Sequence, residues 1–212
     1  MKTEDAAKLA TKDKSEIIIK AGLQLIPYVG GSLSTLYFDT KQEKRFKRLE
    51  SFYNEFSRYV NESGAFIPQI EEHNKESIVA LIEELNEKVE REHTQIKREY
   101  FRNYLLTTLT NSEADKFDEQ KFFLNALSDM TMLECELLMF LNTQLKGAMI
   151  GTIKKNGIEQ YAIVGAIGRL KAYGFIYTIY GQISFGNNND DSLTDRVFMT
   201  PFGQRFISYC LS

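Results

Sequence analysis

The sequence predicts a mainly α protein with a small β-wing, in which a helical bundle or hairpin region is followed by a winged-helix-like module. Long Glu-, Lys- and Leu-rich stretches and only three prolines favour helices. Most of the glycines and the strand-like runs lie after Lys146. The expected order in this last region is helix, helix ending in a glycine, strand, polar loop, strand and helix, which is the order of a winged helix.

The chain has 212 residues, of which 43% are hydrophobic and 26% are charged, so its composition is that of a globular protein of one or two domains. Its net charge of −3 gives no overall attraction for nucleic acid. The polar start has no secretory signal and Cys135 and Cys210 indicate reduced thiols, so we expect a cytoplasmic protein. We expect a flexible N-terminus over residues 1–15, a helical domain over residues 16–129 and a winged-helix-like domain over residues 130–212.

A long helix is expected from about residue 33 to about residue 60. Its apolar positions step by three and four residues, which places them in one stripe along the helix. The stripe consists of Phe46, Leu49, Tyr53, Phe56 and Val60. A stripe of this kind is typical of helices that pack lengthwise on one another. We therefore expect the long helices to pack together and to self-associate.

An uncharged segment, residues 21–38, precedes a basic cluster in the sequence. The basic cluster consists of Lys41, Lys44, Arg45, Lys47 and Arg48. An apolar segment followed by basic residues is typical of a contact with anionic lipid. Pro27 and the Gly30-Gly31 pair divide residues 17–38 into two helices of about ten residues, which cannot cross a bilayer of about 30 Å. We therefore favour a hairpin buried in the protein core or in an oligomer, with peripheral membrane contact as the alternative.

Local patterns mark the elements of the last region. Thr131 and Glu134 form a capping box, in which each side chain accepts a hydrogen bond from the backbone N–H of the other residue. A second helix is expected over residues 159–171. The run 175–180 is rich in β-branched and aromatic residues, which predicts a strand, and residues 196–199 predict the returning strand.

No arrangement of residues in the sequence is typical of catalysis. His73 and His93 have no cysteine or histidine at the spacing of a metal site. The sequence has no glycine-rich phosphate loop, nucleophile elbow or zinc-protease helix. The polar run 187–191 lacks the glycine and the final glutamate of an EF-hand loop, and Cys135 and Cys210 lie on apolar helix faces, where inert buried thiols are expected. We therefore expect a non-enzymatic protein without a metal or a cofactor.

A winged helix can bind DNA through cations near its second helix. The candidate DNA contacts are Lys154, Lys155, Arg169 and Lys171. Residues 147–212 contain six Lys/Arg and four Asp/Glu, a net charge of only +2, which attracts phosphates weakly. Gly165 and Gly168 each cost a helix about 1 kcal/mol relative to alanine, so we expect another element to pack closely against them. A protein–protein surface is favoured, and DNA remains the alternative.

The run from Met199 to Phe206 resembles the leucine-threonine-x-leucine-glycine-x-x-phenylalanine ending of winged-helix modules. Together with the helix start within residues 122–139 and the turn at residues 170–176, it makes residues 120–212 similar in layout to the Abi-alpha family of bacterial abortive-infection proteins. The resemblance implies a bacterial, cytoplasmic, non-catalytic protein of phage defence. It carries over no catalytic residue.

Three functions are compatible with these features. The favoured one is a non-enzymatic bacterial interaction protein of phage defence, which self-associates through its long helices and holds a protein partner. The first alternative is a transcriptional regulator that binds DNA through the winged-helix-like module. The second alternative is a membrane-acting effector that uses the hairpin of residues 17–38.

Overall fold

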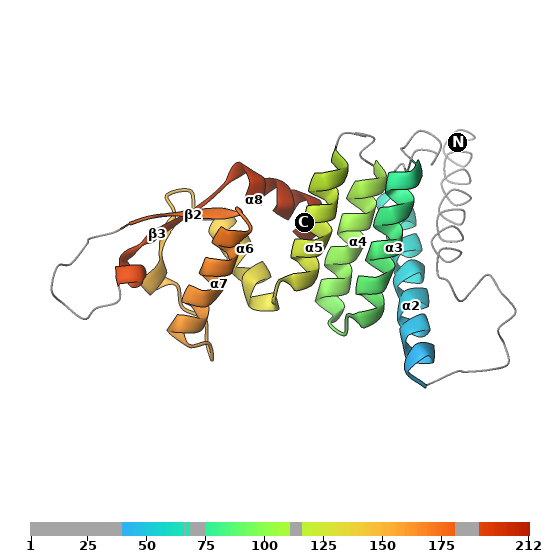
Figure 1. Cartoon of the computed structure of the whole chain (residues 1–212), viewed down its shortest axis with the longest axis horizontal. Coiled ribbons are helices and arrows are strands. Elements are labelled where there is room, and N and C mark those ends of the chain that lie inside the picture. The colour runs from blue at the N-terminus through green and yellow to red at the C-terminus, as the bar shows by residue number, and fades with distance from the viewer. Residues whose placement is uncertain (1–39, 66, 68–74, 111–115, 181–190) are drawn as a thin grey trace, which may run out of the picture. The chain divides into compact units, whose positions relative to one another are not determined.

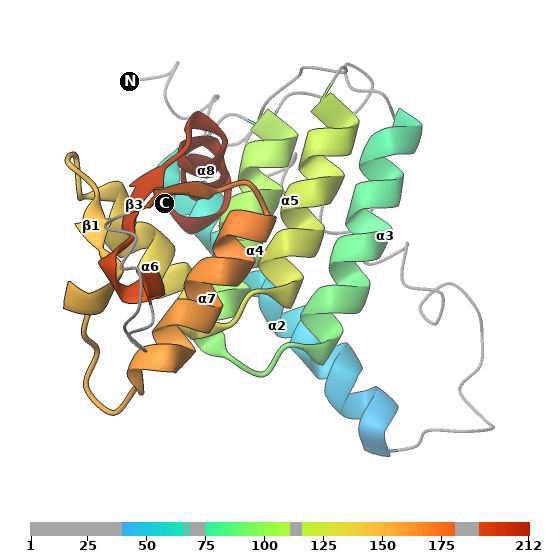
Figure 2. The ribbon, with the colours of Figure 1, turned by 60° about the vertical axis from the view of Figure 1, so that its left-hand side comes forward.

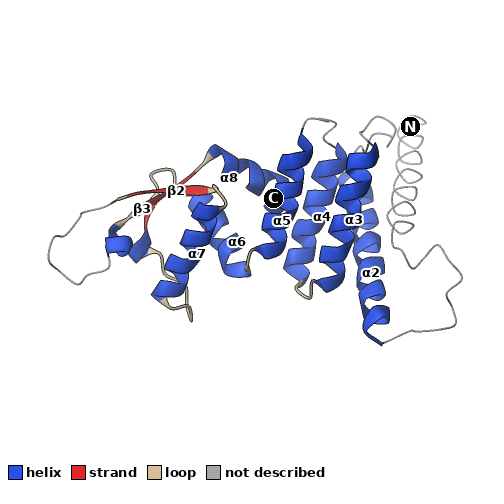
Figure 3. Ribbon diagram, in the orientation of Figure 1, coloured by secondary structure: helices blue, strands red, loops and turns tan. Residues whose placement is uncertain are grey.

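The computed structural model describes residues 40–65, 67, 75–110, 116–180 and 191–212. The chain divides into two compact units, Met1–Ser128 (unit 1) and Asp129–Ser212 (unit 2). The predicted fold class is confirmed, because the described residues are mainly helical and carry a small antiparallel sheet near the C-terminus (Figures 1 and 3). The uncharged segment 21–38 lies outside the described residues.

The described part of unit 1 is a helical bundle. Its helices are α2 (Thr40–Ser63), α3 (Lys75–Arg91), α4 (Gln95–Thr110) and α5 (Phe117–Asp129). Helix α2 packs against α3 and α4, and α3, α4 and α5 run side by side (Figure 2). Each helix has an apolar face, and the bundle forms because these faces cover one another and leave water.

The apolar stripe of α2 lies in the core of this bundle. Leu49, Tyr53, Phe56 and Val60 are each at most 2% exposed, which confirms that these four residues pack against neighbouring helices. The side chain of Phe46 lies outside the described residues. The four described residues of the stripe are thus covered within the bundle, where α2 packs against α3 and α4.

Polar groups inside unit 1 are paired with one another. The hydroxyl of Tyr53 donates to Oδ1 of Asn86 at 2.6 Å, and both residues are buried. The ammonium of Lys97 is also buried, and it donates to the carbonyl oxygen of Ser128 at 2.7 Å. Buried polar groups without partners destabilise a fold, so these contacts fix how the helices are aligned along one another.

Unit 2 combines helices with a three-stranded antiparallel sheet. Its elements are α6 (Met132–Asn142), β1 (Ala148–Met149), the 3₁₀ helix Ile150–Thr152, α7 (Gln160–Ala172), β2 (Ile176–Ile179), the 3₁₀ helix Asp191–Thr194, β3 (Arg196–Met199), α8 (Pro201–Phe206) and the π-helical turn Ile207–Leu211. The strand order is β1-β3-β2. Strand β1 was not expected from the sequence, since a two-residue strand has no periodic pattern of its own.

Helices α6 and α7 cover one face of this sheet. The side chains between them are fully or almost fully buried, among them Ile163, Ile167, Leu170, Ile176 and Val197. The ring of Phe175 stacks on that of Phe206, with centroids 4.3 Å apart, which ties the start of β2 to the last helix. Met149, Tyr177 and Ile179 lie on the opposite face of the sheet, and their side chains are exposed.

Candidate functional site

The four cations predicted to contact DNA all have partners within unit 2. Lys154 donates to the side-chain oxygen of Gln160, and Lys155 forms an ion pair with Glu136. Lys171 donates to the hydroxyl of Thr178 at 2.8 Å. These contacts are exposed, so they do not abolish the positive charges, but each one competes with a phosphate for the same donor atoms.

Arg169 holds together several parts of unit 2. Its Nε lies 2.9 Å from Oε1 of Glu134, and its Nη2 donates to the carbonyl oxygen of Asp129 at 2.8 Å and to the hydroxyl of Tyr173 at 3.1 Å. The hydrogen bond to Tyr173 and the charge of Glu134 raise the pKa of Arg169 above its usual value. Glu134 is only 2% exposed, so Arg169 neutralises a buried carboxylate.

Glu134, the partner of Arg169, also forms the predicted capping box with Thr131. Oγ1 of Thr131 accepts a hydrogen bond from the backbone N–H of Glu134 at 3.3 Å, and Oε2 of Glu134 accepts one from the backbone N–H of Thr131 at 2.6 Å. One carboxylate therefore caps α6 with one oxygen and binds Arg169 with the other. Arg169 is a structural residue of unit 2 in addition to any contact that it makes outside it.

The outward face of α7 carries small residues between Tyr161 and Arg169. Tyr161, Ala162, Gly165, Gly168 and Arg169 are exposed, and a Cβ atom added at either glycine would meet no atom within 4 Å. The expectation that another element packs closely against the two glycines is therefore wrong for the described residues. Their cost in helix stability is not offset by a close contact of α7 with its own unit.

The open face of the sheet carries exposed apolar side chains. Residues paired directly in an antiparallel sheet, and residues two apart along a strand, point to the same face. The pairs Met149–Arg196, Ile179–Arg196 and Tyr177–Phe198 therefore share one face, which we call the open sheet face. Met149 is 40% exposed, Tyr177 45% and Ile179 52%.

Aromatic stacking orders this face. The rings of Tyr177 and Phe198 lie 5.3 Å apart at 16° to one another. Arg196 lies in the same face and its Nη1 donates to the carbonyl oxygen of Lys146 at 3.0 Å. The strand is followed by Tyr180, which is 75% exposed. The open sheet face of Met149, Tyr177, Ile179, Arg196 and Phe198 thus carries one guanidinium and otherwise uncharged side chains.

The basic cluster at the start of α2 is divided in the structure. Arg45 lies 3.5 Å from Glu90, and Nε of Arg48 donates to the carbonyl oxygen of Glu90 at 2.7 Å, so both arginines bind the end of α3. Lys44 and Lys47 are exposed, and the side chain of Lys41 lies outside the described residues. Two of the five cations, Arg45 and Arg48, thus have partners on α3.

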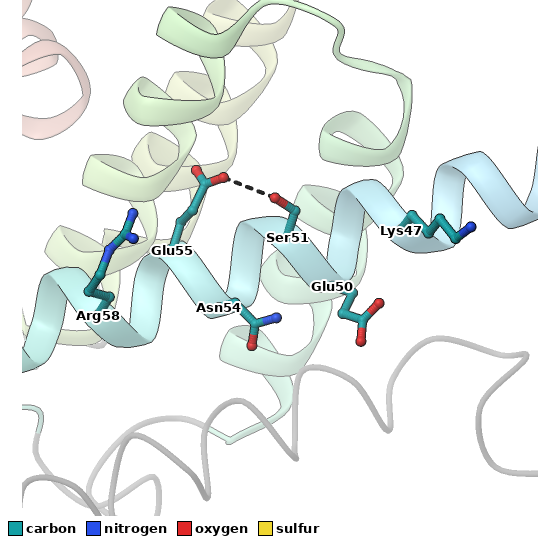
Figure 4. Close-up of a pocket in the computed structure, with 6 residues that line it drawn as sticks. All are labelled: Lys47, Glu50, Ser51, Asn54, Glu55 and Arg58. Carbon is teal, nitrogen blue, oxygen red and sulfur yellow. Dashed lines mark hydrogen bonds between the residues drawn. The ribbon is translucent and has the colours of Figure 1, made fainter.

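Lys47 lines a shallow hollow of mixed charge along α2. Figure 4 shows its lining, which consists of Lys47, Glu50, Ser51, Asn54, Glu55 and Arg58. The hydroxyl of Ser51 donates to Oε1 of Glu55 at 2.9 Å, and Nε2 of Gln95 donates to Oε2 of the same carboxylate at 3.3 Å. All six lining residues come from one helix, and the two cations are matched by two carboxylates, so the hollow has no convergent catalytic arrangement.

The structure describes His93 and the two cysteines. Nδ1 of His93 lies 3.4 Å from Nη1 of Arg48, and His73 lies outside the described residues. Cys135 and Cys210 are both free thiols and fully buried, as expected, and burial raises the pKa of Cys210 well above its usual value. Within the described ranges, no group of three or more His, Cys, Asp and Glu side chains is arranged to hold a metal ion.

The helices of the described residues also bear on the question of a membrane crossing. None of the helices within the described ranges has both the length and the apolar character that a bilayer crossing requires. The hairpin predicted at residues 17–38 lies outside these ranges.

Comparisons of the chain with protein-family models, with curated proteins and with solved structures gave no match. The candidate site therefore depends on the residues themselves. The residue types of 175–180 predict a strand but do not show which of its faces is exposed, although the alternation of Tyr177 and Ile179 in an uncharged strand is a sign of it. The contribution of Met149 had no sign in the sequence, because β1 is too short.

Proposed function

We propose that this chain is a non-enzymatic bacterial interaction protein that contacts another protein through the open sheet face of unit 2. The observation that carries the proposal is the exposure of Tyr177 and Ile179, which are 45% and 52% exposed on an ordered strand. Aromatic and aliphatic side chains held in fixed positions bury area on binding with little loss of conformational entropy. The stacked ring of Phe198 holds Tyr177 in place before any partner arrives.

The charges of unit 2 support a protein partner over a DNA duplex. Binding to a duplex depends on cations that are available to phosphates. Lys154, Lys155, Arg169 and Lys171 each have a partner in unit 2, and that of Arg169 is a buried carboxylate. A protein surface needs no such cations and matches a patch that is mostly uncharged.

The order of elements in unit 2 supports a winged-helix-like module, with α7 in the position of the second helix and β2 and β3 as the wing strands. In a DNA-binding module of this kind α7 would enter the major groove and offer side chains that bind bases. Beside Tyr161 and Arg169, which is bound to Glu134, its outward face offers Ala162, Gly165 and Gly168, which have no polar side-chain groups. The resemblance of residues 120–212 to Abi-alpha proteins supports phage defence as the setting of the interaction.

Site-specific photo-crosslinking in bacterial cells tests this proposal. A photoreactive amino acid replaces Ile179 in one variant and Ile96 in a matched control, since Ile96 is also apolar and is 48% exposed but lies on α4 of unit 1. We expect a discrete protein product from position 179 that is resistant to nuclease, and no such product from position 96.

The outcomes of this experiment separate the candidate functions. A nuclease-sensitive product from position 179 would overturn the protein partner in favour of nucleic acid. The same product from both positions, or none from position 179, would show that the open sheet face is not the contact surface.

A further inference from the structure

We propose that the partner protein covers the open sheet face with a segment that places an aspartate or glutamate carboxylate on Arg196 and apolar side chains on either side of it. This inference rests on the proposed function and deepens it by stating the chemistry of the partner. It is carried by the position of Arg196, because a guanidinium within a contact surface restricts what can cover that surface.

Arg196 lies in the middle of one row of the open sheet face. It is paired with Met149 on β1 and with Ile179 on β2, and β3 is the central strand, so the three side chains form a row across the sheet. All three residues are exposed. A partner that covers the apolar side chains of Met149 and Ile179 must therefore also cover the guanidinium between them.

The guanidinium of Arg196 is oriented by its own unit but keeps its charge. Its Nη1 donates to the carbonyl oxygen of Lys146 at 3.0 Å, and this carbonyl belongs to a turn in which the N–H of Gly147 donates to the carbonyl oxygen of Gln144 at 2.8 Å. A carbonyl oxygen is a neutral acceptor. The bond to Lys146 uses one of the five N–H donors of a guanidinium, which leaves donors for a further acceptor.

The burial of this charge sets a condition for the partner. An ionised group that leaves water without an opposite charge destabilises a complex. A carboxylate meets the condition, because it neutralises a guanidinium and accepts two parallel hydrogen bonds from it. Because Met149 and Ile179 flank Arg196, the side chains that flank this carboxylate should be apolar.

The charges around the face also favour an acidic partner. Met149, Tyr177, Ile179 and Phe198, the other members of the open sheet face, are uncharged. Beside the face, Lys146 is exposed, and Asp195 precedes β3 and is not part of the face. A surface that carries a cation and no carboxylate is complementary to a surface that carries carboxylates.

Two other occupants match this arrangement less well. A second copy that pairs its open sheet face with this one would bring two guanidiniums together and supply no carboxylate. A lipid bilayer that takes up Met149 and Ile179 would draw the guanidinium between them towards the hydrocarbon, which is unfavourable for a charged side chain. The hydrogen bond to Lys146 also opposes the movement by which an arginine returns to the headgroups.

Photo-crosslinking from position 179 in Arg196 variants tests this inference in cells. Arg196→Glu and Arg196→Gln should each lower the yield of the protein product at least about tenfold, because the carboxylate of the partner is then repelled or left unpaired. Arg196→Lys keeps the charge and should retain more of the product than Arg196→Gln. Lys44→Glu, at an exposed residue of α2 in unit 1, is the matched control for the change in net charge and should leave the yield unchanged.

A charge exchange separates a direct contact from a structural role of Arg196. Mass spectrometry of the crosslinked peptide identifies the segment of the partner, in which we expect an aspartate or glutamate between apolar residues. Replacing that acidic residue by lysine should abolish the product with the wild type and restore it with Arg196→Glu. No restoration is expected if Arg196 acts only by holding the turn at Lys146. Circular dichroism melting of each Arg196 variant establishes that it is folded.

The outcomes distinguish this inference from the proposed function. A protein product whose yield does not depend on Arg196, or whose crosslinked segment contains no aspartate or glutamate, would overturn the carboxylate contact and leave the proposed function intact. A product that joins the open sheet faces of two copies would do the same. A crosslink to lipid or nucleic acid, whose phosphates would bind the same arginine, or no product from position 179, would overturn both.

Discussion

Nε of Arg169 lies 2.9 Å from Oε1 of Glu134, a residue that is 2% exposed and that caps the helix on which it lies. The sequence predicts that this arginine contacts DNA, because it lies in the second helix of the expected winged-helix-like module. The structure shows that it neutralises a buried charge in its own unit. A loss of DNA binding in an Arg169 variant would therefore not identify a DNA contact, and Lys154 and Lys155 are the informative positions.

Replacing Arg169 should destabilise unit 2. Arg169→Ala leaves the carboxylate of Glu134 buried without its cation and removes a hydrogen bond to the carbonyl oxygen of Asp129. We expect the free energy of unfolding to fall by about 1–2 kcal/mol, measured by urea denaturation followed by circular dichroism. Lys171→Ala is the control, since it removes one exposed contact and should change stability by less than about 0.5 kcal/mol. Equal effects of the two variants would contradict the role given to Arg169.

The hydrogen bond between Tyr53 and Asn86 should contribute measurably to the stability of unit 1. Tyr53→Phe removes the hydroxyl that donates to Asn86 at 2.6 Å, and we expect a loss of about 1 kcal/mol. Tyr161→Phe, at a residue that is 53% exposed, should have no measurable effect in the same urea titration.

Tyr53 should also contribute stability that is lost at alkaline pH. Burial raises the pKa of Tyr53 well above its usual value, and the hydrogen bond to Asn86 opposes this only in part. In the unfolded chain the phenol loses its proton near pH 10, about its usual pKa, while the folded chain retains it. The contribution of Tyr53 is thus fully present below about pH 10 and decreases as the pH rises above it. Thermal melting over this range should show a shallower decline for Tyr53→Phe than for the wild type.

Glu92 should contribute stability that is lost in acid instead of in alkali. Burial raises the pKa of Glu92, but hydrogen bonds from Thr94 and His93 and the charge of Lys97 outweigh burial and lower the pKa below its usual value of 4.5. Its contribution to stability is therefore present above the unfolded pKa and is lost as the pH falls through the lowered folded value. We expect Glu92→Gln to reduce the acid dependence of the melting temperature.

An exposed carboxylate serves as the control for this measurement. Glu62→Gln, at the exposed end of α2, should melt with the same acid dependence as the wild type. An unchanged acid dependence in Glu92→Gln would show that the bonds of Glu92 do not stabilise the fold.

The glycines of unit 2 should respond to alanine in opposite directions. A Cβ at Gly165 or Gly168 meets no atom within 4 Å, so Gly165→Ala and Gly168→Ala should each raise the free energy of unfolding by up to about 1 kcal/mol through helix propensity. A Cβ at Gly203 would overlap the carbonyl oxygen of Phe175 and lie 2.7 Å from Sδ of Met199, so Gly203→Ala should be destabilising. Urea titrations of the three variants check the signs, and a destabilised Gly168→Ala would contradict the open position of that residue.

The elements of the fold could largely be predicted because their signs are local. Thr131 and Glu134 are three residues apart, and their capping box formed as the sequence indicated. The spacing of Leu49, Tyr53, Phe56 and Val60 predicted a buried helix face, and these residues are buried. The spacing did not say whether the face would be covered by the same chain or by a second one, because both arrangements require the same apolar stripe.

The sequence by itself determined which segments are helical, where α6 begins and which side chains are apolar, since hydrogen bonds and periodicity within a few residues decide these properties. The tertiary structure alone decided which distant residues come into contact. Arg169 binds a carboxylate on another helix, and Ala148 pairs with Val197 on a distant strand. At Gly165 and Gly168, an added Cβ atom would have no neighbouring atom within 4 Å. The physical reason is that such contacts join residues that are far apart in the sequence and become neighbours only when the chain between them folds back. No pattern within either segment encodes which distant residue will be its neighbour.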